Sequence, residues 1–378
     1  MKRAVIILPT YNEAGNINRI IEEIFAQQVK IPSDWELHVL VVDDNSPDKT
    51  ADAVKRMQVK QSRLHLITGK KQGLGKAYVK GFSHAIKELN AEVLFEMDAD
   101  FSHPPTLIPK LLKGIIDGAD FVIGTRYIKG GSIPSGWGLH RKVFSGLGNI
   151  IIQLGFMNFK IHDWTSGFRA IKSRVIENLI PQMPQYSGYV FQIALLDKVL
   201  KNKAVIKEIP LRFGERKKGV SKINAPEYIF NLLAYVIQNS SFIKYVFVGF
   251  AGFFIDFSIA YLIINFLNLN KALANSLSAE VAIVSNFFLN NFWVFKHKKI
   301  AGGALAYLRK FLLFNFVSSG SILIQGLGMW AATTLLGDFD LNLLGLKLQV
   351  WIIYKVFIIA LLVIPYSYIM YNKIIWKD

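Results

Sequence analysis

The sequence predicts two parts: a Rossmann-like α/β domain with a mostly parallel sheet covered by helices on both faces, then an all-α domain of four membrane spans. Two observations predict this. Up to about residue 240, short apolar runs alternate with amphipathic segments and charges recur every few residues. Beyond it come apolar stretches of membrane length. We expect the α/β domain at 1–223, an interfacial linker at 224–240 and the membrane domain at 241–378.

Predicted strands and helices alternate along the α/β part. Short apolar runs predict strands at 5–8, 37–42, 64–68, 93–97 and 121–123. Apolar residues at helical spacing predict helices at 16–28, 74–89 and 106–117, with Thr106 as N-cap of the last. This alternation favours parallel strands, whose carboxyl ends form the binding crevice of such folds.

The membrane half has four apolar stretches, at 242–266, 272–293, 308–336 and 348–370. Each exceeds the roughly 20 residues that span a bilayer. The loop at 296–310 holds five basic residues, whereas the other two loops hold only Lys271 and Lys347. The positive-inside rule therefore places the basic loop and both chain ends in the cytoplasm. No signal peptide is evident at the N-terminus, so we expect a multi-pass protein of a prokaryotic plasma membrane with its α/β domain cytoplasmic.

Three charged residues fall inside the predicted spans, at similar depth: Asp256, Glu280 and Lys355. A lone charge at that depth costs about 2.5–3.5 kcal/mol on insertion scales, so such residues usually pair or line a polar path. We expect Lys355 to pair with Glu280, Asp256 or both. The pair would be a structural clasp or part of a path for a sugar headgroup.

Composition limits the partners. The net charge is +17, of which residues 1–240 contribute +11 and residues 241–378 contribute +6. Such a balance suits nucleic acid, anionic lipid or phosphate-rich substrates. No nucleic-acid-binding motif is present, so we expect no nucleic acid partner. The chain has no cysteine, which excludes disulfides and thiolate metal sites.

Polar residues cluster at the ends of four predicted strands, around Tyr11, Asp44, Asp98 and Arg126. Asp98 and Asp100 follow a buried strand and flank one small residue, so both side chains point the same way. Two adjacent carboxylates repel unless a cation lies between them, and hard oxygen ligands favour Mg²⁺ or Mn²⁺. We predict a metal site there, with His103 as a candidate third ligand.

Several motifs resemble family 2 glycosyltransferases of the GT-A fold. They are 5–13 (VIILPTYNE), 41–48 (VVDDNSPD), 73–77 (GLGKA), 97–104 (MDADFSHP), 124–127 (GTRY), 130–132 (GGS), 165–170 (TSGFRA) and 188–192 (GYVFQ). Within that family they are most similar to dolichol- and polyprenol-phosphate mannose synthases. The membrane half resembles the GtrA-like four-helix domain, because FIKY at 242–245 and NNFW at 290–293 are echoed by LRKF at 308–311 and YNKIIW at 371–376.

The resemblance implies a metal-dependent, inverting β-D-mannosyltransferase that moves mannose from GDP-mannose to dolichyl or polyprenyl phosphate. It implies these donor-binding residues: Pro9, Tyr11, Glu13, Asp43, Asp44, Lys76, Asp98, Arg216 and Lys222, the last two with Ser221 in a loop over the donor phosphates. Arg126, Arg141 and Ser145 are implied for the acceptor phosphate, which guanidinium groups suit by their bidentate geometry. Asp100, Arg126 and Arg141 would be catalytic.

Other functions stay open at this point. The donor could be UDP-glucose or a UDP-N-acetylhexosamine on the same fold. The membrane half could act in transport of the lipid-linked sugar. A processive polysaccharide synthase is disfavoured, because the Gln-X-X-Arg-Trp motif of such enzymes is missing. The sequence leaves the lipid length and self-association undecided.

Overall fold

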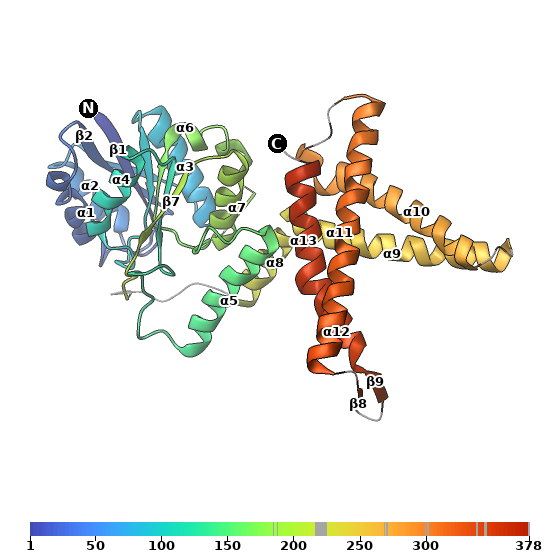
Figure 1. Cartoon of the computed structure of the whole chain (residues 1–378). Coiled ribbons are helices and arrows are strands. Elements are labelled where there is room, and N and C mark those ends of the chain that lie inside the picture. Colours follow the sequence, from blue (N-terminus) through green and yellow to red (C-terminus); the bar gives the residue numbers. More distant parts are fainter. Residues whose placement is uncertain are drawn as a thin grey trace. The chain divides into compact units, whose positions relative to one another are not determined.

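The computed structural model describes residues 1–183, 185–186, 188–215, 225–267, 269, 271–298, 300, 302–337, 339–343 and 346–376. The chain forms two compact units, residues 1–236 and 237–378. Figure 1 shows the helices and strands of both units.

The first unit is built on a seven-stranded sheet of order β3-β2-β1-β4-β6-β5-β7. Its strands are β1 (Lys2–Thr10), β2 (Trp35–Asp43), β3 (Leu64–Thr68), β4 (Val93–Glu96), β5 (Phe121–Thr125), β6 (Arg169–Lys172) and β7 (Ile206–Pro210). The pairs of β1 with β2 and β4, of β2 with β3 and of β5 with β7 are parallel. β6 runs antiparallel to both of its neighbours, β4 and β5.

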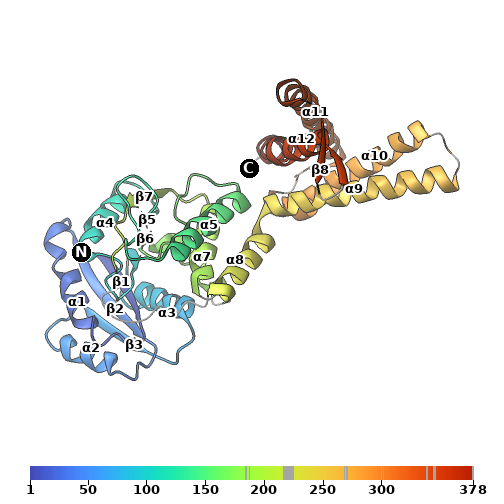
Figure 2. The same ribbon diagram turned by 90° about the horizontal axis from the view of Figure 1, so that it is seen from below.

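Helices cover both faces of this sheet, as the sequence predicts (Figure 2). They are α1 (Ile17–Phe25), α2 (Thr50–Gln58), α3 (Leu74–Lys87), α4 (Ile108–Ile116), α5 (Leu139–Phe156), α6 (Ser173–Ile176), α7 (Gly188–Lys201) and α8 (Ala225–Asn239). Alternate residues of β1 point to opposite faces. Ala4, Ile6 and Leu8 share one core with α1 and α4. On the other face, a Cβ added to Gly81 of α3 would lie 2.6 Å from a methyl carbon of Ile7, so α3 packs very close to the sheet there.

The five predicted strands and three predicted helices are all present, with ends shifted by a few residues. The predicted N-cap is wrong, because Thr106 lies inside a 3-10 turn, η2 (Pro105–Leu107), and α4 starts at Ile108 without a side-chain cap. The two strands that were not foreseen, β6 and β7, complete the sheet on the far side of β4.

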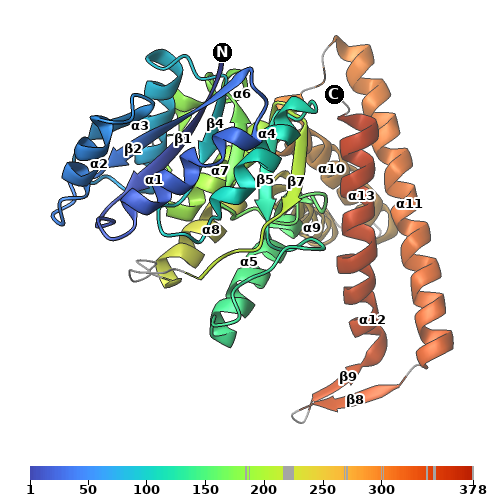
Figure 3. The same cartoon turned by 90° about the vertical axis from the view of Figure 1, so that its left-hand side faces the viewer.

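The second unit consists of two helical hairpins. α9 (Ser241–Phe266) packs along α10 (Lys271–Leu289), and α11 (Ala304–Leu336) packs against α12 (Val350–Ile358) and α13 (Ile364–Met370), which a π-helical segment, η6 (Ile359–Val363), joins. A short β-hairpin, β8 (Asp340–Leu343) and β9 (Leu346–Gln349), connects α11 to α12 (Figure 3). Ser240 caps α9 by accepting a hydrogen bond from the backbone N–H of Ile243 at 2.9 Å.

Three helices in the described part of the chain are long and apolar enough to cross a bilayer: Ser241–Phe266, Ala304–Leu336 and Ile353–Ile375. The second predicted span forms as α10 but is not among them. α10 carries Lys271, Glu280 and several Ser and Asn residues in 19 positions, which lowers its apolar character. The predicted span at 272–293 stays a prediction for α10.

The predicted intramembrane ion pair is not formed in the part of the chain that the structure describes. Among the described residues, no ion pair joins Lys355 to Glu280 or Asp256, and the side chains of Lys355 and Glu280 are exposed. Asp256 instead accepts a hydrogen bond from the hydroxyl of Ser278 at 2.5 Å. The Ser278 hydroxyl on α10 therefore stabilises this carboxylate, where a lysine was predicted.

The weak internal repeat has a structural counterpart. Asn290–Val294 and Tyr371–Ile375 are both π-helical turns, η4 and η7, which end in Phe295 and Trp376. These two rings stack with centroids 4.7 Å apart. The Trp376 indole N–H donates to the side-chain oxygen of Asn291 at 3.1 Å. The two repeated turns thus pack directly against each other.

Candidate active site

The two carboxylates of the predicted metal site lie just beyond β4 and differ in exposure. The Asp98 side chain is 37% exposed, whereas Asp100 is buried. Oδ1 of Asp100 accepts hydrogen bonds from the backbone N–H of Ser102 at 3.0 Å and from its hydroxyl at 2.5 Å, so the turn holds this carboxylate in place. An all-oxygen donor pair of this kind suits Mg²⁺ or Mn²⁺.

The geometry of His103 argues against its predicted role as third metal ligand. Its ring is buried between Phe168 and Phe213, and burial lowers its pKa to about 4. Nδ1 accepts the backbone N–H of Asp98 at 2.9 Å. The neutral ring then carries its proton on Nε2, which makes that nitrogen a donor rather than a ligand. The described residues hold no group of three His, Cys, Asp or Glu side chains placed to bind one ion.

The two aspartates after β2 have separate roles. Asp43 is fully buried, and its oxygens accept hydrogen bonds from the Thr10 hydroxyl at 3.0 Å and from the backbone N–H and hydroxyl of Ser46 at 2.9 and 2.6 Å. Asp43 therefore fixes the loop in this structure, and its predicted role in donor binding stays a prediction. Asp44 is partly exposed, and burial with the neighbouring charge of Asp43 raises its pKa.

The turn after β1 is pinned beside the turn after β2. The backbone N–H groups of Asn12, Glu13 and Ala14 donate to side chains of Ser46, Thr50 and Asp48, at 2.9–3.0 Å. Predicted donor residues from both strands are thereby brought to one place.

Lys71 joins these residues and was not foreseen. Its ammonium lies 3.7 Å from the centroid of the Tyr11 ring, and its charge partly offsets the rise in the pKa of Asp44. The signal was the run KKQGLGK at 70–76, whose last lysine, Lys76, was predicted and lies exposed in the first turn of α3.

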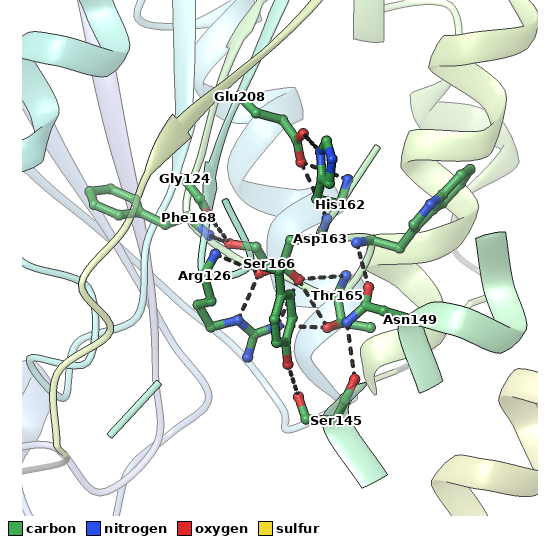
Figure 4. A network of polar contacts seen from close by, with 12 residues as sticks. Gly124, Arg126, Ser145, Asn149, His162, Asp163, Thr165, Ser166, Phe168 and Glu208 are labelled. Carbon is green, nitrogen blue, oxygen red and sulfur yellow. Dashed lines mark hydrogen bonds and ion pairs between the residues drawn. The ribbon is translucent and has the colours of Figure 1, made fainter. Parts of the chain in front are cut away.

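Arg126 directly follows β5 and is engaged by a carboxylate that the sequence reading missed. Its Nε and Nη2 donate to Oδ2 and Oδ1 of the fully buried Asp163, both at 2.7 Å (Figure 4). Nη2 also donates to the hydroxyl of Thr165 at 2.7 Å. The guanidinium lowers the pKa of Asp163 against the effect of burial, so the pair is ionised.

The other predicted acceptor residues lie on α5. The guanidinium of Arg141 stacks over the ring of Trp137, 3.9 Å from its centroid. One turn later, the hydroxyl of Ser145 shares a 2.6 Å hydrogen bond with the phenol of Tyr127, the residue after Arg126. The structure thus links β5 to α5, and acceptor binding by Arg126, Arg141 and Ser145 stays a prediction.

A second contact ties α5 to the segment that precedes β6. The side-chain oxygen of Asn149 accepts the backbone N–H of Trp164 at 2.8 Å, and its amide donates to the carbonyl of Ser145 at 3.1 Å. Neither Asn149 nor Asp163 belongs to a charge cluster or sequence motif of its own. Only the TSGFRA run that follows at 165–170 marked this segment.

The predicted donor-phosphate loop, with Arg216, Ser221 and Lys222, lies outside the described residues. The chain just before it is fixed, because the backbone N–H of Gly214 donates to the carbonyl of Ser102 at 2.9 Å. Glu215 accepts the backbone N–H of Gly136 at 3.0 Å.

Behind the site, Arg169 at the start of β6 faces Glu96 at the end of β4. Both side chains are fully buried, and Arg169 Nη1 lies 3.6 Å from a Glu96 oxygen. Arg169 donates instead to the carbonyls of Gln192 and Trp164, at 2.9 and 3.1 Å. Burial raises the pKa of Glu96 to about 7.

Comparison with known proteins supports the predicted family of each half of the chain. The profile of glycosyl transferase family 2 matches residues 5–180, and that of the GtrA/DPMS transmembrane domain matches residues 244–376. A dolichol-phosphate mannosyltransferase of Pyrococcus furiosus is 31% identical over 314 residues, which are 81% of this chain and 84% of that protein. A polyprenol monophosphomannose synthase of Mycolicibacterium smegmatis is 36% identical over 59% of this chain and 82% of its own length.

Among solved structures, glucosyl-3-phosphoglycerate synthase of Mycobacterium tuberculosis aligns with a TM-score of 0.46 and 16% identity, over 62% of this chain and 79% of that one. That likeness is too distant to bear on the site. The sequence relatives suffice, because the first of them matches across both units. The chain belongs to glycosyltransferase family 2 and carries a GtrA/DPMS transmembrane domain.

Proposed function

We propose that this protein transfers mannose from GDP-mannose to dolichyl or polyprenyl phosphate at a membrane surface, with inversion at the anomeric carbon. The named relatives act on such lipids, which supports the acceptor and the sugar. The observation that carries the proposal is one sheet edge that holds two carboxylates, Asp98 and Asp100, after β4 and the cationic residue Arg126 after β5.

The reaction that these groups suit needs little acid–base chemistry. A phosphate oxygen of the acceptor is already anionic, so it can attack the anomeric carbon without a general base. That bond forms as the bond from the sugar to the β-phosphate breaks, and the nucleoside diphosphate leaves with the electron pair. Attack from the opposite face converts an α-linked donor to a β-linked product. The residues mainly position the two phosphates and offset their charge.

A divalent cation held by Asp98 and Asp100 would offset the charge of the leaving diphosphate as a Lewis acid. The donor set fits such an ion, since it offers two adjacent carboxylates of which one is partly exposed. Chelation with EDTA should abolish transfer, and Mg²⁺ or Mn²⁺ should restore it. Asp100→Ala should be inactive with its fold retained. Full transfer in excess EDTA would contradict metal dependence.

An exposed apolar stripe on α5 supports a lipid acceptor. The side chains that form it are large, between 38% and 77% exposed, and recur at helical spacing: Leu139, Val143, Phe144, Leu147, Ile150, Ile151 and Leu154. Soluble surfaces rarely expose such a patch without a partner. We assign this stripe to the bilayer surface. The opposite side of the helix carries Ser145 and Asn149, so a phosphate at the surface would lie near the site.

α8 supports the same orientation. Leu232, Tyr235 and Val236 are buried in the first unit, and the phenol of Tyr235 donates to Asp197 of α7 at 2.9 Å. Phe230 is 71% exposed on another side of the helix. α8 then leads directly into α9, the first membrane-length helix, which holds the catalytic unit near the bilayer.

The test is a donor panel on the full-length protein. Purified protein in lipid nanodiscs is given polyprenyl phosphate and each radiolabelled GDP- or UDP-sugar. We expect label in lipid only with GDP-mannose. Transfer from a UDP-sugar instead would replace the proposed donor while keeping the reaction class. No transfer from any sugar nucleotide would overturn the proposal.

Arginine variants test the acceptor side of the same proposal. Arg141→Ala removes a charge-assisted phosphate contact and should lower transfer by more than about tenfold. Nucleotide binding should be largely retained. A variant that loses nucleotide binding but keeps acceptor affinity would show that Arg141 serves the donor.

A further inference from the structure

A closed ring of polar contacts surrounds the end of β5. Arg126 and Tyr127 leave the strand, Ser145 and Asn149 lie on α5, and Asp163 and Trp164 precede β6. Asp163 holds Arg126, Trp164 donates to Asn149, Asn149 donates to Ser145, and Ser145 bonds Tyr127 (Figure 4). We call these six residues the polar ring. It joins three segments that are far apart in the sequence.

We propose that Asp163 is a positioning residue, which fixes Arg126 and, through the polar ring, sets its place relative to Arg141 on α5. The proposal rests on the proposed function, in which these two arginines bind the acceptor phosphate. Arg141, Ser145 and Asn149 recur every four residues, so they share one face of the helix. A contact that fixes Ser145 and Asn149 therefore also fixes the start of that face.

The geometry of Asp163 fits a positioning role rather than direct ligand binding. It is fully buried, and its two oxygens accept the backbone N–H, Nε and Nη2 of Arg126, at 3.1, 2.7 and 2.7 Å. The Thr165 hydroxyl and backbone N–H add two longer contacts of 3.3 Å. A carboxylate satisfied in this way cannot turn toward substrate. It holds the Arg126 guanidinium in one orientation through Nε and Nη2.

The segment that carries Asp163 is itself fixed from outside the ring. Glu208 of β7 accepts the backbone N–H groups of His162 and Asp163, at 3.0 and 3.2 Å. Aromatic rings flank the guanidinium of Arg126, with the centroids of Tyr127 and Phe213 at 5.2 and 5.5 Å. Pre-organisation of this kind matters most for a group whose task is alignment of a reacting phosphate.

Asp163→Asn keeps the size of the side chain and removes its charge. With the full-length protein, GDP-mannose and polyprenyl phosphate, we expect kcat/KM for the lipid to fall by about tenfold or more, and KM for GDP-mannose to change by less than about twofold. Asn149→Ala should give a smaller loss, about threefold, because it breaks the ring without touching Arg126. Wild-type acceptor kinetics in Asp163→Asn would overturn the proposal.

Asp120→Asn is the matched control. Asp120 directly precedes β5, whereas Arg126 directly follows it, and Asp120 pairs with Lys172 and Arg174 at 3.1 and 3.0 Å. Its replacement removes an ion-paired aspartate of the same domain at the other end of the strand. We expect transfer within about twofold of wild type. An equal loss in Asp120→Asn and Asp163→Asn would assign the effect to general destabilisation and overturn the proposal.

Hydrogen exchange without substrate separates this inference from the proposed function. Peptides that cover α5 and residues 161–168 should exchange faster in Asp163→Asn and Asn149→Ala, but not in Asp120→Asn. Unchanged exchange in these peptides would show that the polar ring does not fix α5, even if transfer fell. If the wild-type protein transfers no sugar to polyprenyl phosphate, the proposed function fails, and the exchange result still decides whether the ring fixes α5.

Discussion

Two buried arginine–carboxylate pairs lie at the two ends of the segment from Asp163 to Arg169, and they differ in geometry. Arg126 and Asp163 meet through two hydrogen bonds of 2.7 Å. Arg169 and Glu96 are separated by 3.6 Å, and within the described part of the chain neither Glu96 oxygen has a well-formed hydrogen bond. Each of the four side chains is at least nine-tenths buried.

Geometry, not residue type, sets the protonation of each carboxylate. Burial raises the pKa of both, but a guanidinium at hydrogen-bond distance more than offsets this for Asp163, whose pKa is lowered. Arg169 offsets it only in part, so the pKa of Glu96 rises to about 7. The first pair is therefore an ion pair at neutral pH, and the second is poised to hold a proton.

The largest effect should come from breaking the satisfied pair. Arg126→Met leaves the buried Asp163 carboxylate without its cation, which should lower the free energy of unfolding by about 3–5 kcal/mol. Urea titration of the full-length protein, followed by tryptophan fluorescence, measures it. Arg174→Met, which removes an exposed partner of Asp120, should cost less than about 1 kcal/mol. A similar small cost for both variants would contradict the comparison.

Breaking the other pair should cost less. Arg169→Met removes hydrogen bonds to two backbone carbonyls, worth about 1–3 kcal/mol together. The pKa of Glu96 is already raised to about 7, so this carboxyl group needs little further change to become neutral, whereas Asp163 is ionised in the native pair. The same urea titration ranks the two arginine variants. A greater loss in Arg169→Met than in Arg126→Met would reverse the comparison.

A pH series sharpens the difference further. The folded state keeps a proton on Glu96 up to about pH 7, whereas the unfolded chain loses it near pH 4.5, so stability from this group is lost as pH rises across that window. Histidines whose pKa is lowered in the folded state, such as His65, make the protein more stable as pH rises. The wild-type curve of stability against pH therefore contains both contributions. The difference between wild type and Glu96→Gln isolates the carboxylate. From pH 4.5 to pH 8, the free energy of unfolding of Glu96→Gln should rise by a few kcal/mol relative to that of the wild type. A flat difference would show that Glu96 titrates normally.

The contribution of Asp163 to stability should not change with pH between pH 5 and pH 8. Its folded pKa is lowered, so its stabilisation is present above the unfolded value of 3.8 and is lost only as pH falls below it. The difference between wild type and Asp163→Asn should stay constant from pH 5 to pH 8. A slope in that window would mean that Asp163 takes up a proton there and is not held as an ion.

The smallest effect concerns Glu96 at low pH. At pH 5 the folded protein holds Glu96 in its neutral form, which an amide replaces with almost the same shape. Glu96→Gln should then change the free energy of unfolding by less than about 1 kcal/mol. A thermal melt at pH 5 checks it, with the wild type alongside. A large loss would reveal a hydrogen bond to the acid proton that only oxygen can make.

Local pattern was enough to place most strand ends. Tyr11, Asp44, Asp98 and Arg126 follow four runs that the sequence marks as buried strands. Parallel strands bring their carboxyl ends to one edge, so these residues were expected together. The structure confirms the five predicted strands and their shared edge. The sequence pattern predicted the same role for Asp43 and Asp44, but only Asp43 is fully buried. Strand alternation alone does not show which of two neighbouring side chains a loop will cover.

The sequence by itself determined the two-part organisation, the alternating α/β pattern and the carboxylates beyond β4, because each depends on periodicity within about ten residues. Only the tertiary structure decided the partner of Arg126. β6 runs antiparallel, so the residues before it, rather than those after it, reach the active edge. Asp163 thereby meets an arginine 37 positions earlier. No local pattern encodes such a contact, since it depends on the direction of a strand that long-range pairing with β4 and β5 fixes.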